Sequence, residues 1–193
     1  MNSNEKNGFL RRLFGGVNMT WPVVLLYAVG TALVTALFLI LPIFKNTSFQ
    51  RVGETLEAWI LFAIILMAHC KTPLESAQKT FVFFLVSQPL IYLLQVPFSW
   101  QGWGLFQYYP HWFILTLLTF PTAYVGWYIT KRNWVSMVIL LPVLCFLAYT
   151  GFGGIQDAMA RFPHHLLVAV FCFGQIVVYV LAFTPICGLS WKR

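Results

Sequence analysis

The sequence predicts an all-α integral membrane protein, a compact bundle of about six transmembrane helices with both termini in the cytoplasm. Three observations lead to this prediction. First, 60% of the 193 residues are apolar and only 9% are charged, against about a quarter in an ordinary soluble domain. Second, the apolar residues form runs long enough to cross a bilayer, and third, the basic residues gather on one side of these runs. A water-soluble globule is excluded, because a domain of this size would have to expose much of its apolar surface.

The expected spans follow from the length that a bilayer requires. A helix needs roughly 17 to 25 mostly apolar residues to cross about 30 Å of hydrocarbon. Runs of this kind are expected at residues 22–44, 55–69, 80–98, 111–129, 134–151 and 163–187. The second run is the shortest, and its full crossing is left open. The connections are roughly 4 to 12 residues long, so residues 21–193 are expected to form a single transmembrane domain.

The positions of the charged residues predict the orientation. With six crossings, both termini lie on the same side, and nine of the twelve basic residues lie there with them. The positive-inside rule makes this side cytoplasmic. All of the net charge of +7 then falls on the cytoplasmic side, where it would meet the anionic lipids of the inner leaflet. Because these lipids account for the charge, nucleic acid is not an expected partner.

Residues 1–20 are expected to be a basic cytoplasmic leader. They contain no apolar core long enough for a cleavable signal peptide before the first span. Apolar residues surround Arg11 and Arg12, which is typical of a short helix that lies on the inner leaflet. A leader without regular structure is the alternative.

Prolines stand near the middle of three successive spans. Pro89, Pro121 and Pro142 each lack an N–H group and free a carbonyl about one turn earlier. The third, fourth and fifth helices are therefore expected to be kinked at a similar depth. The kinks would either border a cavity at the midplane or only reflect how common proline is in membrane helices.

Small residues recur every four positions in the first span. Ala28, Ala32 and Ala36, beside Gly30, predict a flat stripe on which another helix can pack closely. Packing within the chain is favoured over docking of a partner membrane subunit. In length, number of spans and this stripe, the chain is similar in outline to the substrate-binding S components of energy-coupling-factor transporters. The stripe is the one motif that matches, and no ligand-binding residue carries over from that family.

Uncharged polar and aromatic residues are the candidate ligand-binding groups, because hydrocarbon offers them no partner and they tend to face the bundle interior. Those in the third and sixth spans are spaced to share one helix face, and the outer loop 99–110 combines aromatic, glutamine and glycine residues without a charge. The alternatives are hydrogen bonding between helices and an aromatic belt at the headgroups. The candidates are Gln88, Tyr92, Gln95, Trp100, Trp103, Gln107, His111, Trp112, Gln175 and Tyr179.

The few ionisable residues do not predict a catalytic or metal site. Glu54 and Glu57 are expected to be exposed near the outer interface, where they would interact with a helix N-terminus. A metal site at Asp157, His164 and His165 is disfavoured, because adjacent histidines on a helix point about 100° apart. His69 and Cys70 are sequence neighbours and do not face each other on a helix. No catalytic residue, metal or cofactor is therefore predicted.

The functional prediction is a small-molecule permease, or the substrate-binding membrane subunit of a transporter, for an uncharged or aromatic ligand. One alternative is a non-catalytic assembly or immunity protein that binds other helices. A membrane-embedded enzyme that uses His69 and Cys70 is the other. The short loops fit a multi-pass protein of a bacterial plasma membrane.

Overall fold

The computed structural model describes residues 13–14, 18–45, 47–160 and 166–184. Within these ranges every regular element is helical. The elements in chain order are α2 (Trp21–Ile40), η1 (Pro42–Phe44), α3 (Ser48–Glu54), α4 (Leu56–His69), α5 (Pro73–Gln95), η2 (Val96–Phe98), η3 (Gly102–Tyr108), α6 (Tyr109–Gly126), η4 (Trp127–Lys131), α7 (Trp134–Ala160) and α8 (Leu166–Phe183), where η marks a 3-10 helix.

The apolar helices confirm the predicted class of an all-α membrane protein. In the described part of the chain, five segments are long and apolar enough to cross a bilayer, namely 21–40, 73–98, 102–131, 134–160 and 166–183. The second expected span, α4, is apolar but has only 14 residues. At 1.5 Å per residue it is about 21 Å long, which is shorter than the hydrocarbon core. The count of six crossings and the side on which the termini lie stay predictions.

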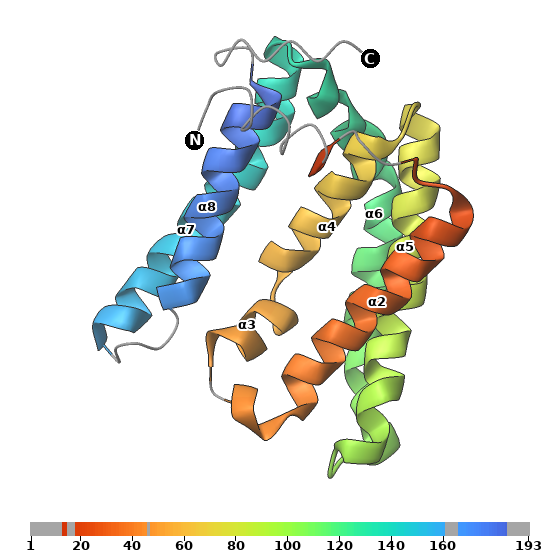
Figure 1. Cartoon of the computed structure of the whole chain (residues 1–193), viewed down its shortest axis with the longest axis vertical. Helices are drawn as coiled ribbons and strands as arrows, with labels where there is room; N and C mark the ends of the chain where they lie inside the picture. Colours follow the sequence, from red (N-terminus) through yellow and green to blue (C-terminus); the bar gives the residue numbers. More distant parts are fainter. Residues whose placement is uncertain (1–12, 15–17, 46, 161–165, 185–193) are drawn as a thin grey trace.

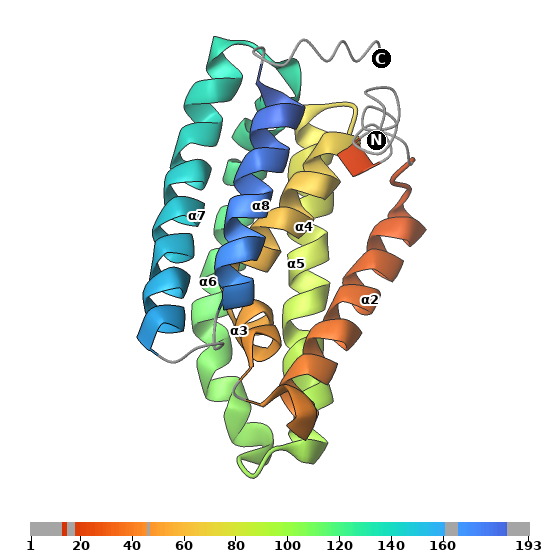
Figure 2. The same cartoon turned by 60° about the vertical axis from the view of Figure 1, so that its left-hand side comes forward.

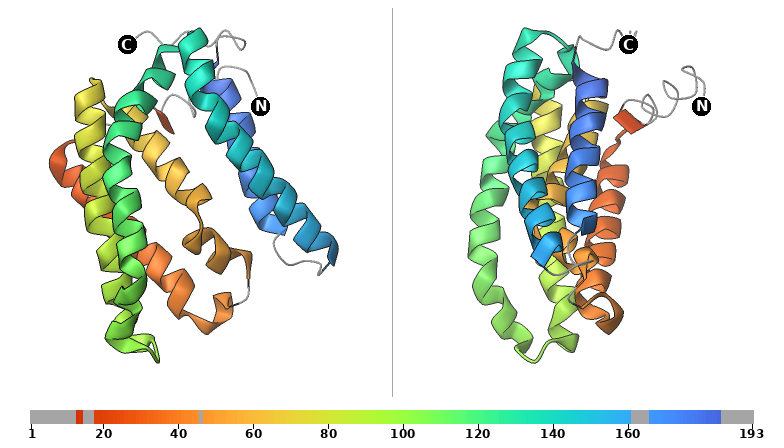
Figure 3. Two further views of the ribbon diagram at one scale, coloured as in Figure 1. Left: turned by 180° about the vertical axis from the view of Figure 1, so that it is seen from behind. Right: turned by 90° about the vertical axis from the view of Figure 1, so that its left-hand side faces the viewer.

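The helices form two groups with α4 between them. In one group α5 packs along both α2 and α6, and in the other α7 and α8 form an antiparallel hairpin (Figures 1 and 2). The hairpin makes few contacts with α6, and most of its contacts with the rest of the chain involve η4 and α3. Figure 3 shows from behind how the two groups diverge away from the end where α8 finishes. This divergence leaves α4 lying between the groups.

The alanine stripe of α2 packs inside the chain. Ala28, Ala32 and Ala36 are buried, and the first two belong to a core cluster with residues of α4 and α5 such as Trp59 and Phe83. A small side chain at each position lets the backbones of α2 and α5 approach closely, which strengthens dispersion contacts where no water is available to be released. A partner subunit that bound through α2 would have to use the opposite, exposed face of this helix.

Helices α5, α6 and α7 continue through their prolines. Pro89, Pro121 and Pro142 each lie inside a helix that the structure describes as unbroken. On α6, Thr122 next to Pro121 donates a hydrogen bond from Oγ1 to the carbonyl of Leu118 (2.7 Å). This bond goes to the carbonyl four residues before Thr122 and does not replace the one that Pro121 cannot donate to Leu117. The bends at the three prolines stay a prediction.

Arg132 joins η4, α7 and α8 at the end of the bundle where α8 finishes. Its φ of 52° is left-handed and turns the chain between η4 and α7. Its side chain donates a hydrogen bond to the carbonyl of Ala182, which lies in the last turn of α8. Partial burial lowers the pKa of Arg132 to about 10. The guanidinium therefore stays charged at neutral pH, and its charge complements the carbonyl end of α8.

Replacing Ala32 with leucine tests the packing of α2 on α5. Ala32 is fully buried, whereas Val34 on the same helix is 51% exposed. Ala32→Leu should destabilise the protein by about 1 to 3 kcal/mol, because the added carbons force the helices apart. Val34→Leu should change stability by less than about 0.5 kcal/mol. The free energy of unfolding in mixed micelles measures both, and equal effects would contradict the packing described.

Candidate functional site

The candidate site is a cavity between α4, α5, α6 and α7. Its volume is about 700 Å³, within the range of small-molecule sites, which hold roughly 300 to 1,000 Å³. Its lining includes Leu56 to Met67 on one face of α4, Thr80 and Phe84 of α5, Trp112 to Gly126 on one face of α6, and Ile139 to Val143 of α7. No charged residue lines it among the residues that the structure describes.

The cavity is open toward the surface between α6 and α7. Leu118 and Val125 of α6 line it, yet their side chains are 53% and 50% exposed. The two helices make few contacts with each other over this length. Because the helices are apolar enough to lie in a bilayer, the medium at this opening is lipid. A molecule dissolved in the membrane therefore has direct access to the site.

The threonines of α6 contribute little polarity to the cavity. Thr116 donates a hydrogen bond from Oγ1 to the Trp112 carbonyl (2.9 Å), and Thr119 donates one to the Thr116 carbonyl (2.6 Å). Thr122 is bonded to the Leu118 carbonyl in the same way. Each hydroxyl thus bonds to the backbone of its own helix, as is usual for threonine in a membrane helix. The site therefore offers mainly carbon to a ligand.

Thr80 is the exception among the threonines that line the cavity. Its Oγ1 is buried and has no hydrogen-bond partner among the described residues. One turn earlier on α5, Ser76 donates a hydrogen bond to the carbonyl of Ala123 on α6 (3.1 Å). A buried hydroxyl without a partner costs about 1 to 3 kcal/mol. Thr80 as a whole is only 1% exposed, so this hydroxyl lies behind the surface of the cavity and does not face a ligand directly.

Gly126 of α6 and Met67 of α4 face each other at the η4 end of the cavity. A side chain added at Gly126 would place its Cβ 2.7 Å from the Sδ atom of Met67, so only glycine leaves this methionine in place. Both residues line the cavity. Methionine is unbranched and polarisable, and it adapts its conformation to irregular apolar surfaces. This end can therefore adjust to ligands of different length.

The structure brings a few of the predicted ligand residues together near η3, where α5 ends and α6 begins. Trp112 lines the cavity and donates a hydrogen bond to Tyr92. Tyr92 lies 5.8 Å from Phe106, on which Trp103 stacks at the same distance between ring centroids. These four residues form an aromatic cluster at one end of the cavity, in which Trp103 is 69% exposed.

The remaining predicted ligand residues lie elsewhere. Gln175 and Tyr179 are buried where α8 meets α4, Gln88 is buried on α5, and Gln95 bonds to the Ile91 carbonyl of its own helix (3.1 Å). Exposed side chains at the outer end are those of Trp100, Gln107 and His111. Of the ten residues, only Trp112 lines the cavity.

The cavity residues that sequence reasoning missed carry a weak signal. Thr116, Thr119 and Thr122 recur at helical spacing before Gly126, and this polar stripe on a membrane helix could have marked a packing face or a site. The sequence gives no indication of Thr80, because whether its hydroxyl finds a hydrogen-bond partner depends on where α4 and α6 lie.

The ionisable residues are arranged differently from the expectation. Glu57 was expected to be exposed, but it is only 4% exposed, because α8 covers the start of α4. Asp157 forms an ion pair with Arg51, 106 positions away, at 2.8 Å. His164 and His165, which the sequence analysis considered with Asp157 as metal ligands, lie outside the described residues, as does most of the leader 1–20. Nowhere in the described ranges do three potential metal ligands gather.

His69 and Cys70 do not form a catalytic pair. His69 donates from Nδ1 to the Ile65 carbonyl (2.7 Å), and the thiol of Cys70 donates to the Leu66 carbonyl (3.3 Å). The Cys70 carbonyl in turn accepts a hydrogen bond from Trp127 Nε1 (2.9 Å). Both side chains therefore bond to backbone carbonyls near the end of α4. These bonds do not favour a catalytic role for the two residues.

The comparisons with known proteins give no family for the chain. No family model matches it, and no curated protein or solved structure shows significant similarity to it. The outline similarity to S components therefore has no support beyond the alanine stripe.

Replacing Thr80 with valine tests whether its hydroxyl lacks a partner. Valine has the shape of threonine without the hydroxyl, so Thr80→Val should raise the free energy of unfolding in delipidated micelles by about 1 kcal/mol. Ser76→Ala removes a hydroxyl that is hydrogen-bonded, so this substitution should lower the free energy of unfolding by about 1 kcal/mol. If Thr80→Val destabilises the protein as much as Ser76→Ala does, the Thr80 hydroxyl is satisfied.

Proposed function

We propose that the protein binds an elongated, largely apolar small molecule inside the bilayer, as a permease or as the substrate-binding membrane subunit of a transporter. The observation that carries the proposal is the cavity of about 700 Å³ with an apolar lining and an opening toward lipid. A core packed only for stability leaves few voids larger than a water molecule. A cavity of this size is instead typical of a ligand site.

The shape of the cavity favours a chain-like ligand. Its lining on α6 extends from Trp112 to Gly126, which is about 21 Å along the helix axis at 1.5 Å per residue. This is about two thirds of the hydrocarbon thickness of a bilayer. An acyl or isoprenoid chain that lies along α6 fits this length better than a small round molecule does.

The chemistry of the lining favours an uncharged ligand. A charged group would lose its hydration without gaining a partner, because no described residue of the lining carries a charge. The aromatic cluster at Trp112 suits a ligand with an unsaturated end. The uncharged ligand expected from the sequence is therefore retained, with its site moved to the cavity.

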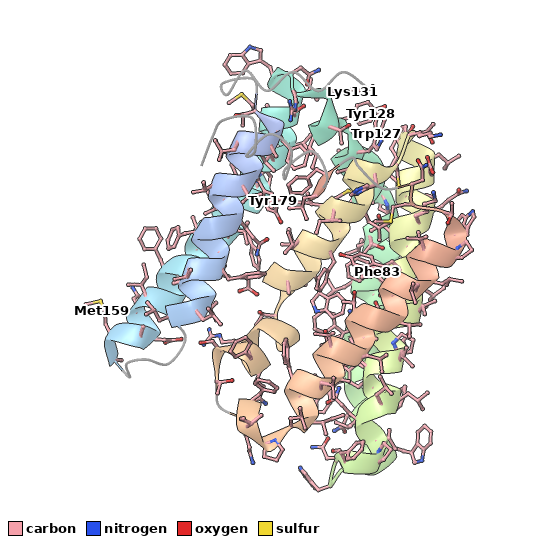
Figure 4. All side chains as sticks on the ribbon, in the orientation of Figure 1. Phe83, Trp127, Tyr128, Lys131, Met159 and Tyr179 are labelled. Carbon is pink, nitrogen blue, oxygen red and sulfur yellow. The ribbon has the colours of Figure 1, made fainter. Side chains whose placement is uncertain are left out.

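The same proposal places the protein in a bacterial plasma membrane with its termini in the cytoplasm. Lys131 and Met159 lie at opposite ends of the bundle (Figure 4). Lys71, Lys79 and Arg132 belong to the Lys131 end, where α4, α6 and α8 finish and α5 begins. This end would face the anionic inner leaflet, which the excess of positive charge favours. A membrane subunit that binds through the exposed face of α2 is compatible with this orientation.

Two tryptophan substitutions on α7 test the binding site. Val143 lines the cavity, whereas Leu141, two residues earlier, points to the surface and is 59% exposed. Native mass spectrometry of the purified unsubstituted protein should show a bound apolar molecule in stoichiometric amount. Val143→Trp should abolish this adduct by filling the cavity, and Leu141→Trp should preserve it. An adduct that persists equally in both variants, or is missing from the unsubstituted protein, would refute the proposed site.

A further inference from the structure

Glu57 is a carboxyl group buried within the membrane-embedded bundle. It is the second residue of α4 and is only 4% exposed. Its Oε2 atom is fully buried and has no hydrogen-bond partner in the parts of the chain that the structure describes. Polar groups buried in proteins nearly always have a partner, and ionisable residues within membrane bundles commonly belong to ion or proton pathways. Glu57 thus needs an explanation beyond packing.

Helix α8 supplies the polar groups around Glu57. Gln175 donates a hydrogen bond from Nε2 to the backbone carbonyl of Glu57 (3.2 Å), and the Tyr179 hydroxyl donates to Gln175 Oε1 (2.7 Å). Tyr179 lies on the side of α8 that faces α4 (Figure 4). Cys172, one turn before Gln175, interacts electrostatically with Glu57, and its Sγ lies 3.5 Å from Thr150 Oγ1 of α7.

Among the residues that the structure describes, the other ionisable groups around this site come from α2, α3 and α7. Tyr27 of α2 interacts electrostatically with Tyr179. Arg51 of α3 donates to Asp157 of α7 at 2.8 Å, so the nearest cation in sequence is already paired. None of these groups is recorded in an ion pair with Glu57. A carboxylate without a paired cation is costly in a dry site, so Glu57 requires a positive ion of its own.

We propose that Glu57 is a proton-binding site within the membrane. The competing ligand, a metal cation, needs several oxygen atoms in its coordination shell. The Glu57 carbonyl and Gln175 Oε1 each already accept one hydrogen bond, and in the described part of the chain no group of three His, Cys, Asp or Glu residues could hold a metal ion. A proton needs only the unpartnered carboxyl oxygen. Binding a proton turns the carboxylate into a neutral acid, and no other bond is formed or broken.

The site is close to water on the α3 side. Glu57 follows the break between α3 and α4 at Thr55, and the side chain of Arg51 is 42% exposed. The Arg51–Asp157 ion pair is partly exposed on this side, and the proposal takes the proton from the aqueous phase there. The proposal is independent of the apolar cavity, since Glu57 does not line it. Carboxyls of this type form the proton relays of pumps and transporters.

Infrared difference spectra between high and low pH test the proposal. The protein is placed in phosphatidylcholine nanodiscs with the complete chain intact. On acidification we expect a carboxylic-acid carbonyl band at the high frequency typical of an apolar environment. The band should be lost in Glu57→Gln and retained in Glu75→Gln, since Glu75 is an interfacial carboxyl paired with Lys79. A band that is unchanged in Glu57→Gln would overturn the proposal.

A second measurement needs no substitution, so it stands even if Glu57→Gln does not fold. Dicyclohexylcarbodiimide is apolar and reacts with protonated carboxyls inside membranes. Peptide mass spectrometry should find Glu57 modified at low pH and less so at high pH. The absence of modification at any pH would refute the proton site. A control adds sodium chloride or choline chloride at constant pH. If sodium chloride suppresses the modification and choline chloride does not, the ligand of Glu57 is a metal cation and the proposal is overturned.

Discussion

The structure depends on one constraint: inside a bilayer, each polar group must find its partner within the chain. The helical backbone satisfies its own amides, and side-chain hydroxyls do the same by bonding to carbonyls about one turn earlier. Thr31 bonds to the Tyr27 carbonyl (2.7 Å) and Thr116 to that of Trp112 (2.9 Å). The outer surfaces of the helices are then left to apolar side chains. This explains how a chain with only 9% charged residues can remain folded with a largely apolar outer surface.

Departures from this constraint identify the positions of interest. In the described part of the chain, Thr80 on α5 and Glu57 on α4 each hold a buried oxygen without a hydrogen-bond partner. Thr80 borders an apolar cavity that opens to lipid, whereas Glu57 lies among the polar groups of α8. Helix α4 has only 14 residues, which makes it shorter than the hydrocarbon core, and it lies between the two groups of helices. Its position therefore creates both sites at once.

The sequence predicts the features that depend on composition and local spacing. The helical class, the buried stripe of Ala28, Ala32 and Ala36, and the shared face of Gln175 and Tyr179 are of this kind. It does not predict how far the α7–α8 hairpin diverges from α6, because that depends on contacts between distant residues. The cavity and the burial of Glu57 both result from this arrangement. An apolar cavity also lacks the polar residues by which sequence analysis recognises a site.

The central claim is that the bundle crosses a bilayer with η3 and η4 at opposite faces. Cysteine labelling tests it most directly, in a chain whose four native cysteines are replaced by alanine. Gln107→Cys in η3 and Lys131→Cys in η4 are each treated with a membrane-impermeant maleimide on intact bacterial cells. We predict that Gln107→Cys reacts from outside, and that Lys131→Cys reacts only after the membrane is opened. Equal labelling of both positions in intact cells would contradict the account.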